Sequence, residues 1–140
     1  MRSVKNYQEL VNNQIFFGGA ADVEEAIANE QIDIVIDLRV AEPEKVGYTR
    51  VHAPIADKEV DIVPSIQNAV NEVMKAYHDG KKVFFHCGSG SGRAGTIATA
   101  TLLELGQAKT VEEAEQKAKA IRSKVNVREP LKKALKEIYE

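Results

Sequence analysis

One eight-residue segment combines the residue types that phosphate chemistry requires. It runs from His86 to Arg93, reads HCGSGSGR, and contains the only cysteine of the chain, Cys87. A glycine-rich loop allows several backbone N–H groups to point toward one centre, and the positive end of a following helix adds to their field, so such a loop binds anions. The same field stabilises a thiolate, which makes Cys87 a candidate nucleophile. An inert buried thiol is the alternative for Cys87.

Arg93 supplies the second part of this chemistry. Its planar guanidinium can bind two oxygens of one phosphate group at once, a geometry that the point charge of a lysine does not offer. For His86, the last residue of an expected strand, we predict a structural hydrogen-bonding role rather than one in proton transfer. The residues that we expect to surround a bound phosphate are Gly88, Ser89, Gly90, Ser91, Gly92 and Arg93.

The segment needs a strand before it and a helix after it, and the hydropathy pattern supplies the strand. Short apolar runs rich in β-branched residues predict strands, and a run that is apolar on both faces is typical of a parallel sheet buried between helices. The predicted strands are 15–17, with a turn at Gly18 and Gly19, then 32–38, 51–55 and 82–86.

Helical periodicity and capping residues place helices between and after these strands. Asp22 with Glu25, and Thr110 with Glu113, have the spacing of capping boxes, and Pro64 suits a first helical turn. The predicted helices are 22–29, 64–80, 92–105, 110–121 and one from about residue 130. This alternation predicts a single-domain α/β layered fold over residues 1–140, with a mostly parallel central sheet flanked by helices. In such sheets ligands bind at the carboxyl ends of the strands, where the glycine-rich loop begins.

Composition limits the classes of protein that can carry this segment. The chain has 140 residues, of which 44% are apolar and 29% charged, and its formal net charge is −2, as in one soluble globular domain. This charge balance argues against a nucleic-acid partner and against stable membrane association. Met1 to Leu10 lacks the apolar stretch of a secretory signal, so we expect a cytoplasmic protein. One cysteine and three dispersed histidines offer no metal site, and we expect no cofactor.

His86, Cys87, five further residues and Arg93 together resemble the HCX5R signature of the protein tyrosine phosphatase superfamily. The chain looks closest to small dual-specificity phosphatases, including the compact prokaryotic ones, and the resemblance extends over about residues 15–105. It implies a dual-specificity-phosphatase-like fold and hydrolysis of phosphomonoesters through a phosphocysteine intermediate. In that family the residue that matches His86 orients the backbone of the cysteine.

The resemblance also implies a general acid on a separate loop, about thirty residues before the cysteine in small family members. Asp57 lies thirty residues before Cys87 and directly after a predicted strand, and we assign it this role with Asp61 as the alternative. Such an acid protonates the leaving-group oxygen and then activates water. The competing interpretation of Asp57 is a solvated loop carboxylate or a helix cap.

Ala94 departs from the family pattern, which usually has serine or threonine directly after the arginine. That hydroxyl helps the thiolate to leave when phosphocysteine is hydrolysed, so its absence bears on turnover more than on phosphate binding. Ser89, Ser91 and Thr96 are the nearby residues whose hydroxyls are candidates to take its place.

The sequence therefore predicts an enzyme that hydrolyses phosphotyrosine, and also phosphoserine and phosphothreonine, with a phosphorylated protein as substrate or, alternatively, a small phosphorylated molecule. The loop lacks the lysines that phosphoinositide phosphatases often place there, which weighs against a highly charged lipid headgroup. Ala94 favours one alternative function, a phosphate-binding module that recognises phosphorylated partners without turning them over. Rhodanese-like sulfur transfer fits less well, because those loops are typically one residue shorter between cysteine and arginine. An arsenate-reductase relay requires further cysteines, which the chain lacks.

Overall fold

The computed structural model describes residues 5–140, so the first four residues of the amino-terminal segment considered above lie outside it. Within these residues five strands form one mixed sheet in the order β1-β2-β5-β3-β4. β1 pairs with β2 antiparallel, and every other neighbouring pair is parallel, which confirms the predicted mostly parallel sheet. The strands are β1 (Gln8–Val11), β2 (Ile15–Gly19), β3 (Ile34–Asp37), β4 (Arg50–His52) and β5 (Val83–Cys87).

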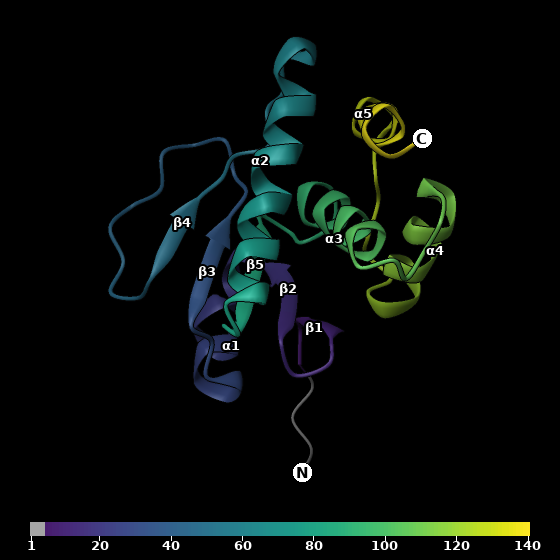
Figure 1. The fold of residues 1–140 in the computed structure, drawn as a ribbon. Coiled ribbons are helices and arrows are strands. Elements are labelled where there is room, and N and C mark those ends of the chain that lie inside the picture. Colours follow the sequence, from purple (N-terminus) through teal and green to yellow (C-terminus); the bar gives the residue numbers. More distant parts are fainter. Residues whose placement is uncertain (1–4) are drawn as a thin grey trace.

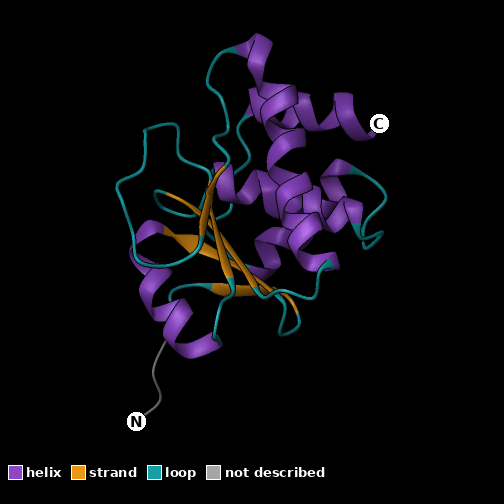
Figure 2. Cartoon of the chain, turned by 60° about the vertical axis from the view of Figure 1, so that its left-hand side comes forward, coloured by secondary structure: helices purple, strands orange, loops and turns teal. Residues whose placement is uncertain are grey.

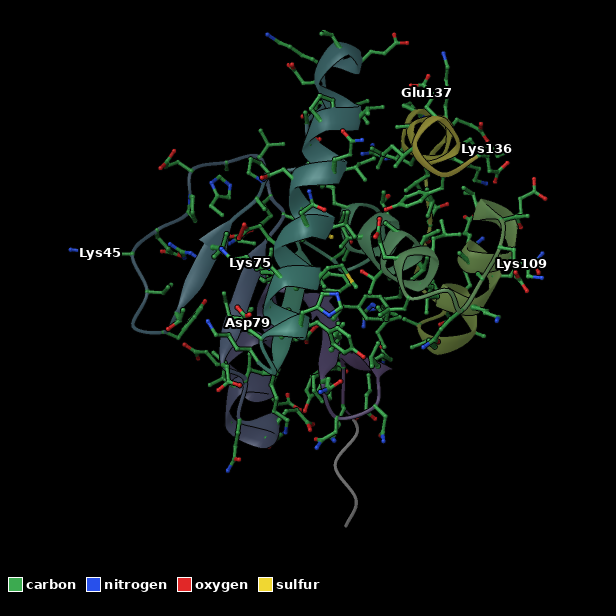
Figure 3. All side chains as sticks on the ribbon, in the orientation of Figure 1. Lys45, Lys75, Asp79, Lys109, Lys136 and Glu137 are labelled. Atoms are coloured by element: carbon green, nitrogen blue, oxygen red, sulfur yellow. The ribbon has the colours of Figure 1, made fainter. Side chains whose placement is uncertain are left out.

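Helices cover both faces of the sheet, as the alternation of strands and helices predicts (Figure 1, Figure 2). α1 (Val23–Glu30), entered through a short 3-10 turn, η1 (Ala20–Asp22), lies on one face. The longer helices lie on the other face: α2 (Glu59–His78), α3 (Arg93–Glu104), α4 (Val111–Ile121) and α5 (Glu129–Tyr139). Lys45, in the loop between β3 and β4, points away from this body (Figure 3). No helix of the described residues has both the length and the apolar character needed to cross a membrane.

The side chains of β5 divide between two hydrophobic cores, because successive residues of a strand point to opposite faces. Val83, Phe85 and Cys87 belong to the larger core, which α2 to α5 cover. Phe84 belongs to the smaller core on the α1 side, where the ring of Tyr7 packs edge-on against it with 6.0 Å between the ring centroids. β5 is therefore buried along its whole length, and its last residue, Cys87, has a fixed position.

The structure corrects the prediction for the first strands. β1 has no counterpart among the predicted strands, because its four residues QELV form a short edge strand in which only Leu10 is buried. Gly18 and Gly19 continue β2 instead of forming the predicted turn, because they pair with His86 and Cys87 of β5. β4 ends at His52, three residues before the end of the predicted strand 51–55.

α2 begins at Glu59, five residues before the predicted start at Pro64. Pro64 lacks the N–H that would donate to the carbonyl of Val60, but Val60 is 80% exposed, so water can bond that carbonyl and the helix tolerates the proline. Asp61, predicted to lie in a loop, consequently belongs to the first turn of a helix.

Of the two predicted helix caps, only the one at Thr110 forms. Thr110 Oγ1 accepts a hydrogen bond from the N–H of Glu113 at 3.1 Å, while the Glu113 carboxylate accepts from the N–H of Lys109 at 2.8 Å. The Asp22 carboxylate makes no capping bond to α1. It accepts instead from the N–H of Gly19 at 2.8 Å, and so ties the end of β2 to the start of α1.

Candidate active site

The sulfur of Cys87 lies at the junction of β5 and α3. Cys87 is 5% exposed, and α3 begins six residues later at Arg93; we call residues 87–93 the anion loop. Sγ of Cys87 accepts hydrogen bonds from the backbone N–H groups of Gly90, at 3.3 Å, and of Ala94, at 3.4 Å. Two N–H dipoles thus point at the sulfur, which is the arrangement needed to hold negative charge there.

The anion loop follows this path only with glycine at position 90. Gly90 has a φ of +76°, in the left-handed region that other residues rarely adopt. A Cβ atom at this position would also lie 2.5 Å from the carbonyl carbon of Gly18 and 2.7 Å from Nη2 of Arg122. The N–H of Ala20 donates to the carbonyl of Gly88 at 2.9 Å, so the residue after β2 also holds the loop in place.

His86, the residue before Cys87 in β5, supports the backbone of the cysteine. Its Nδ1 lies 3.0 Å from the carbonyl oxygen of Cys87, and because a carbonyl only accepts, Nδ1 carries the proton. Burial lowers the pKa of His86, so the ring is neutral at pH 7. A neutral, buried ring bonded to the backbone is consistent with the structural role predicted for His86.

Arg93 and Asp57 meet beside the anion loop. Arg93 Nε donates to the carbonyl of Ile55 at 2.9 Å, and Nη2 forms a hydrogen-bonded ion pair with Oδ1 of Asp57. Asp57 lies in the loop before α2, and its side chain is 68% exposed, whereas that of Arg93 is 22% exposed. The structure therefore brings the predicted acid into contact with the guanidinium predicted to bind phosphate.

Asp61, the alternative acid, does not share this contact. It is exposed in the first turn of α2, where its N–H donates to the carbonyl of Lys58 at 2.9 Å. Of the two candidates, only Asp57 is paired with Arg93.

A second segment, residues 122–128, supports the anion loop, and we call it the support segment. Arg122 directly follows α4 and is 4% exposed. Its Nε donates to the carbonyl of Gly90 at 2.9 Å, and its Nη2 donates to the carbonyl of Ser89 at 3.0 Å. Nη1 reaches Oε1 of Gln8, in β1, at 2.5 Å. Burial lowers the pKa of Arg122, and its contacts fix the path on which the loop N–H groups face the sulfur.

Two more residues of the support segment reach the site. A cavity of about 330 Å³ opens beside the sulfur, and its lining residues are Cys87, Gly88, Ser89, Ser91, Gly92, Arg93, Asn126 and Arg128. The N–H of Asn126 donates to the carbonyl of Ser91 at 3.1 Å. Val125 packs closely on α3, where a Cβ atom at Gly95 would lie 2.9 Å from its Cγ1. No motif marks Arg122, Asn126 or Arg128 in the sequence, so they were not among the predicted site residues.

Residues 15–140 match the family model of the dual specificity phosphatase catalytic domain. The matched range contains both the anion loop and the support segment. The chain belongs to this family. It is thus a phosphatase of the tyrosine and dual-specificity type, as the resemblance of residues 86–93 indicated. A comparison with curated proteins finds no match.

Solved structures share the fold of this phosphatase at low sequence identity. A mouse putative dual specificity phosphatase complexed with zinc tungstate has a TM-score of 0.80 at 17% identity, over 99% of this chain and 89% of that chain. Tk-PTP in its active form has a TM-score of 0.80 at 21% identity, over 98% of each chain. PTPMT1 in complex with PI(5)P has a TM-score of 0.76 at 19% identity, over 96% of this chain and 94% of that chain. These likenesses confirm the predicted dual-specificity-phosphatase-like fold.

The phosphatase does not replace the hydroxyl that is absent at Ala94. The hydroxyls of Ser89 and Ser91 lie 2.8 Å apart and pair with each other, and Thr96 Oγ1 donates to the carbonyl of Gly92 at 2.8 Å. None of the three candidate hydroxyls donates to the cysteine sulfur, which receives backbone N–H groups instead.

Proposed function

We propose that this phosphatase is a cysteine-dependent phosphomonoester hydrolase that works through a phosphocysteine intermediate. The observation that carries the proposal is the convergence of three features on one site: the Cys87 sulfur, the N–H donors around it, and the Arg93–Asp57 pair. These features correspond to a nucleophile, an anion site and a proton carrier, which are the groups that this chemistry requires.

In the first half-reaction the thiolate of Cys87 attacks phosphorus. The S–P bond forms and the bond between phosphorus and the ester oxygen breaks, while Arg93 and the loop N–H groups hold the other phosphate oxygens. Arg93 has N–H groups beyond the two bound to Ile55 and Asp57, and these can bind the phosphate. The bound phosphate then competes with Asp57 for the positive charge of Arg93, which frees Asp57 to face the leaving oxygen. Asp57, protonated, then delivers its proton to the leaving oxygen, and the alcohol or phenol departs neutral.

In the second half-reaction a water molecule attacks the phosphorus of phosphocysteine. The Asp57 carboxylate accepts a proton from the water, the S–P bond breaks, and inorganic phosphate and the thiolate are regenerated. The N–H groups of Gly90 and Ala94 stabilise the departing thiolate. One ester and one water thus give one alcohol and one phosphate, without a cofactor.

Replacing the nucleophile tests the covalent mechanism directly. We expect Cys87→Ser to abolish hydrolysis of 4-nitrophenyl phosphate and to retain binding of inorganic phosphate or tungstate, because the anion site consists of backbone N–H groups and Arg93. Steady-state assays and isothermal titration calorimetry measure the two properties. Turnover that persists in Cys87→Ser would rule out the phosphocysteine intermediate.

Replacing the two candidate acids tests the role of Asp57. We expect Asp57→Asn to slow esters with poor leaving groups, such as phenyl phosphate, far more than 4-nitrophenyl phosphate, because only a poor leaving group needs the proton. The basic limb of the pH–rate profile should also flatten. Asp61→Asn is the matched control and should do neither, and the reverse pattern would transfer the role to Asp61.

As substrates we propose phosphotyrosine, together with phosphoserine and phosphothreonine. The cavity beside Cys87 is small and its lining contains no aromatic residue, so it does not require the length or the ring of a tyrosine. PTPMT1 is solved with the phosphoinositide PI(5)P. This chain has only glycine and serine between Cys87 and Arg93, which weighs against a highly charged lipid headgroup here. Initial rates on matched phosphopeptides, phosphoinositides and sugar phosphates measure the preference.

A phosphate-binding module without turnover is the second candidate function, and Ala94 favours it. None of the nearby hydroxyls of Ser89, Ser91 and Thr96 donates to the sulfur, whose donors are the backbone N–H groups of Gly90 and Ala94. A wild-type protein that binds phosphate but hydrolyses no ester would establish this function and contradict the enzymatic one.

A further inference from the structure

A second arginine lies at the rim of the cavity beside Cys87. Arg128 and Arg93 are the two positively charged residues among the eight that line this cavity. Nε of Arg128 lies 4.0 Å from the point that a Cβ atom on Gly92 would occupy. Its guanidinium therefore lies against the last glycine of the anion loop.

The backbone that carries Arg128 is held firmly. Arg128 is the N-cap residue of α5, and its carbonyl accepts from the N–H groups of Leu131, at 3.0 Å, and Lys132, at 2.9 Å. Two residues earlier, the N–H of Asn126 donates to the carbonyl of Ser91, which links the same segment to the anion loop. An exposed side chain on a fixed backbone loses less conformational freedom when a ligand binds to it.

Arg128 differs from the neighbouring arginines because its side chain has no hydrogen-bonding or ionic partner within the part of the chain that the structure describes. Arg93 binds the carbonyl of Ile55 and Asp57, and Arg122 binds the carbonyls of the anion loop. Among residues 5–140 the exposed side chain of Arg128 makes no hydrogen bond or ion pair. Glu129, the next residue, lines the groove between α2 and α5 rather than this cavity. Since arginine stays protonated at neutral pH, the rim carries an uncompensated positive charge.

We propose that Arg128 binds a second anionic group of the substrate while the phosphate to be hydrolysed lies on the anion loop. The inference rests on the proposed function, because it requires a phosphate bound at Cys87. Arg93 and the loop N–H groups already serve that phosphate, so Arg128 remains available, and its planar donors match a carboxylate or a second phosphate. Arg128 thereby selects phosphomonoesters that carry another anionic group close to the scissile phosphate.

Matched substrate pairs test this selection and distinguish the two sources of the second anion. One pair is glucose 6-phosphate and glucose 1,6-bisphosphate, and the other is a phosphotyrosine peptide flanked by alanines and the same peptide flanked by aspartates. We expect the wild type to have about fivefold higher kcat/KM on the doubly anionic member of one pair, which is the upper range for an ion pair at an exposed site. If the sugar phosphates show this ratio, the second anion belongs to a small molecule. If the peptides show it, the second anion belongs to an acidic peptide.

Three variants assign the selection to Arg128. In Arg128→Gln the ratio of kcat/KM values within the selective pair should fall to about twofold, mainly because KM for the doubly anionic member rises. Arg128→Lys should keep part of the ratio, since the charge remains but the planar donors do not. Lys124→Gln, which removes an exposed charge of the support segment that does not line the cavity, should keep the full ratio.

The proposal fails if the wild type treats the members of both pairs alike, or if a preference survives in Arg128→Gln. A wild type that binds phosphate but hydrolyses no member of either pair would contradict the proposed function itself, and this inference with it. The two failures are distinguishable because only the first leaves measurable turnover.

Discussion

The two segments that form the site contribute to it in opposite ways. The anion loop lines the cavity that we propose as the phosphate site: it contributes the Cys87 sulfur, the N–H groups around that sulfur and the Arg93 guanidinium. The support segment mostly presents its atoms to the anion loop, because Arg122 and the N–H of Asn126 bind carbonyl groups of that loop. In the proposed mechanism the reacting groups therefore lie in the anion loop, and their positions depend on the support segment.

This difference follows from the composition of the anion loop. A loop with three glycines among seven residues has little conformational preference of its own, so contacts from outside must fix its path. The buried guanidinium of Arg122 provides such contacts from a helix end 32 residues away in the chain. Changes in the anion loop should therefore alter chemistry most, and changes in the support segment should alter stability and substrate affinity together.

Among variants that keep the Cys87 nucleophile, Arg93→Lys in the anion loop should have the largest effect. A lysine keeps the charge but cannot bind two phosphate oxygens with a planar fork, so kcat/KM on 4-nitrophenyl phosphate should fall by about 100- to 1,000-fold. Steady-state kinetics measures the loss, and circular dichroism should show an intact fold. An unaltered rate would mean that the anion loop does not hold phosphate through Arg93.

In the support segment, Arg122→Met should reduce stability first and activity second. The carbonyls of Gly90 and Ser89 lose their buried partner, so the free energy of unfolding should fall by about 3 kcal/mol. KM should rise about tenfold as the loop loses its fixed path. Urea denaturation and steady-state kinetics measure both, and Lys124→Met is the exposed control. A loss of rate with unchanged stability would assign Arg122 to the ligand instead of the loop.

Ala94→Ser adds a hydroxyl directly after the anion loop. The added hydroxyl gives the departing thiolate a further donor, so breakdown of phosphocysteine should accelerate about tenfold, as one hydrogen bond to a charged group allows. Stopped-flow measurements should show a burst of phenol release in the wild type that shrinks in the variant. If neither burst nor steady rate changes, breakdown of the intermediate does not limit turnover.

The smallest effect concerns His86, whose ring bonds the carbonyl of Cys87, the first residue of the anion loop. Because burial lowers its pKa, the unfolded chain binds a proton more readily than the folded protein. Its contribution to stability is therefore fully present above the usual histidine pKa of about 6.5, and is lost as pH falls from there through the folded value. The slope is at most about 1.4 kcal/mol per pH unit, the limit for one proton.

Urea denaturation between pH 7.5 and pH 5 measures this contribution. His86→Asn, which keeps a donor for the Cys87 carbonyl, should flatten the dependence on pH over that range. His78→Asn, in the last turn of α2, is the matched control and should leave it unchanged. A wild type whose stability does not change below pH 6.5 would show that His86 is not held neutral by burial.

The amino-acid sequence by itself determined the parts of this protein that are local in the chain. The anion loop is one continuous segment, so the spacing of Cys87, Arg93 and the glycines between them already predicts an anion site. The buried strand and helix on either side are specified by their own apolar residues, which is why the parallel sheet and α3 were predictable. Thr110 capped its helix as predicted because the bond spans only three residues.

Only the tertiary structure decided the contacts between distant segments. Asp57 was predictable as a candidate from its place after a strand, but its pairing with Arg93 across 36 residues depends on the packing of α2 against α3. Arg122 and Arg128 have no local pattern, because an arginine in an exposed loop and an arginine at an active site look alike in sequence. Their partners are brought near by hydrophobic packing of whole helices, which depends on many residues at once and not on any one spacing.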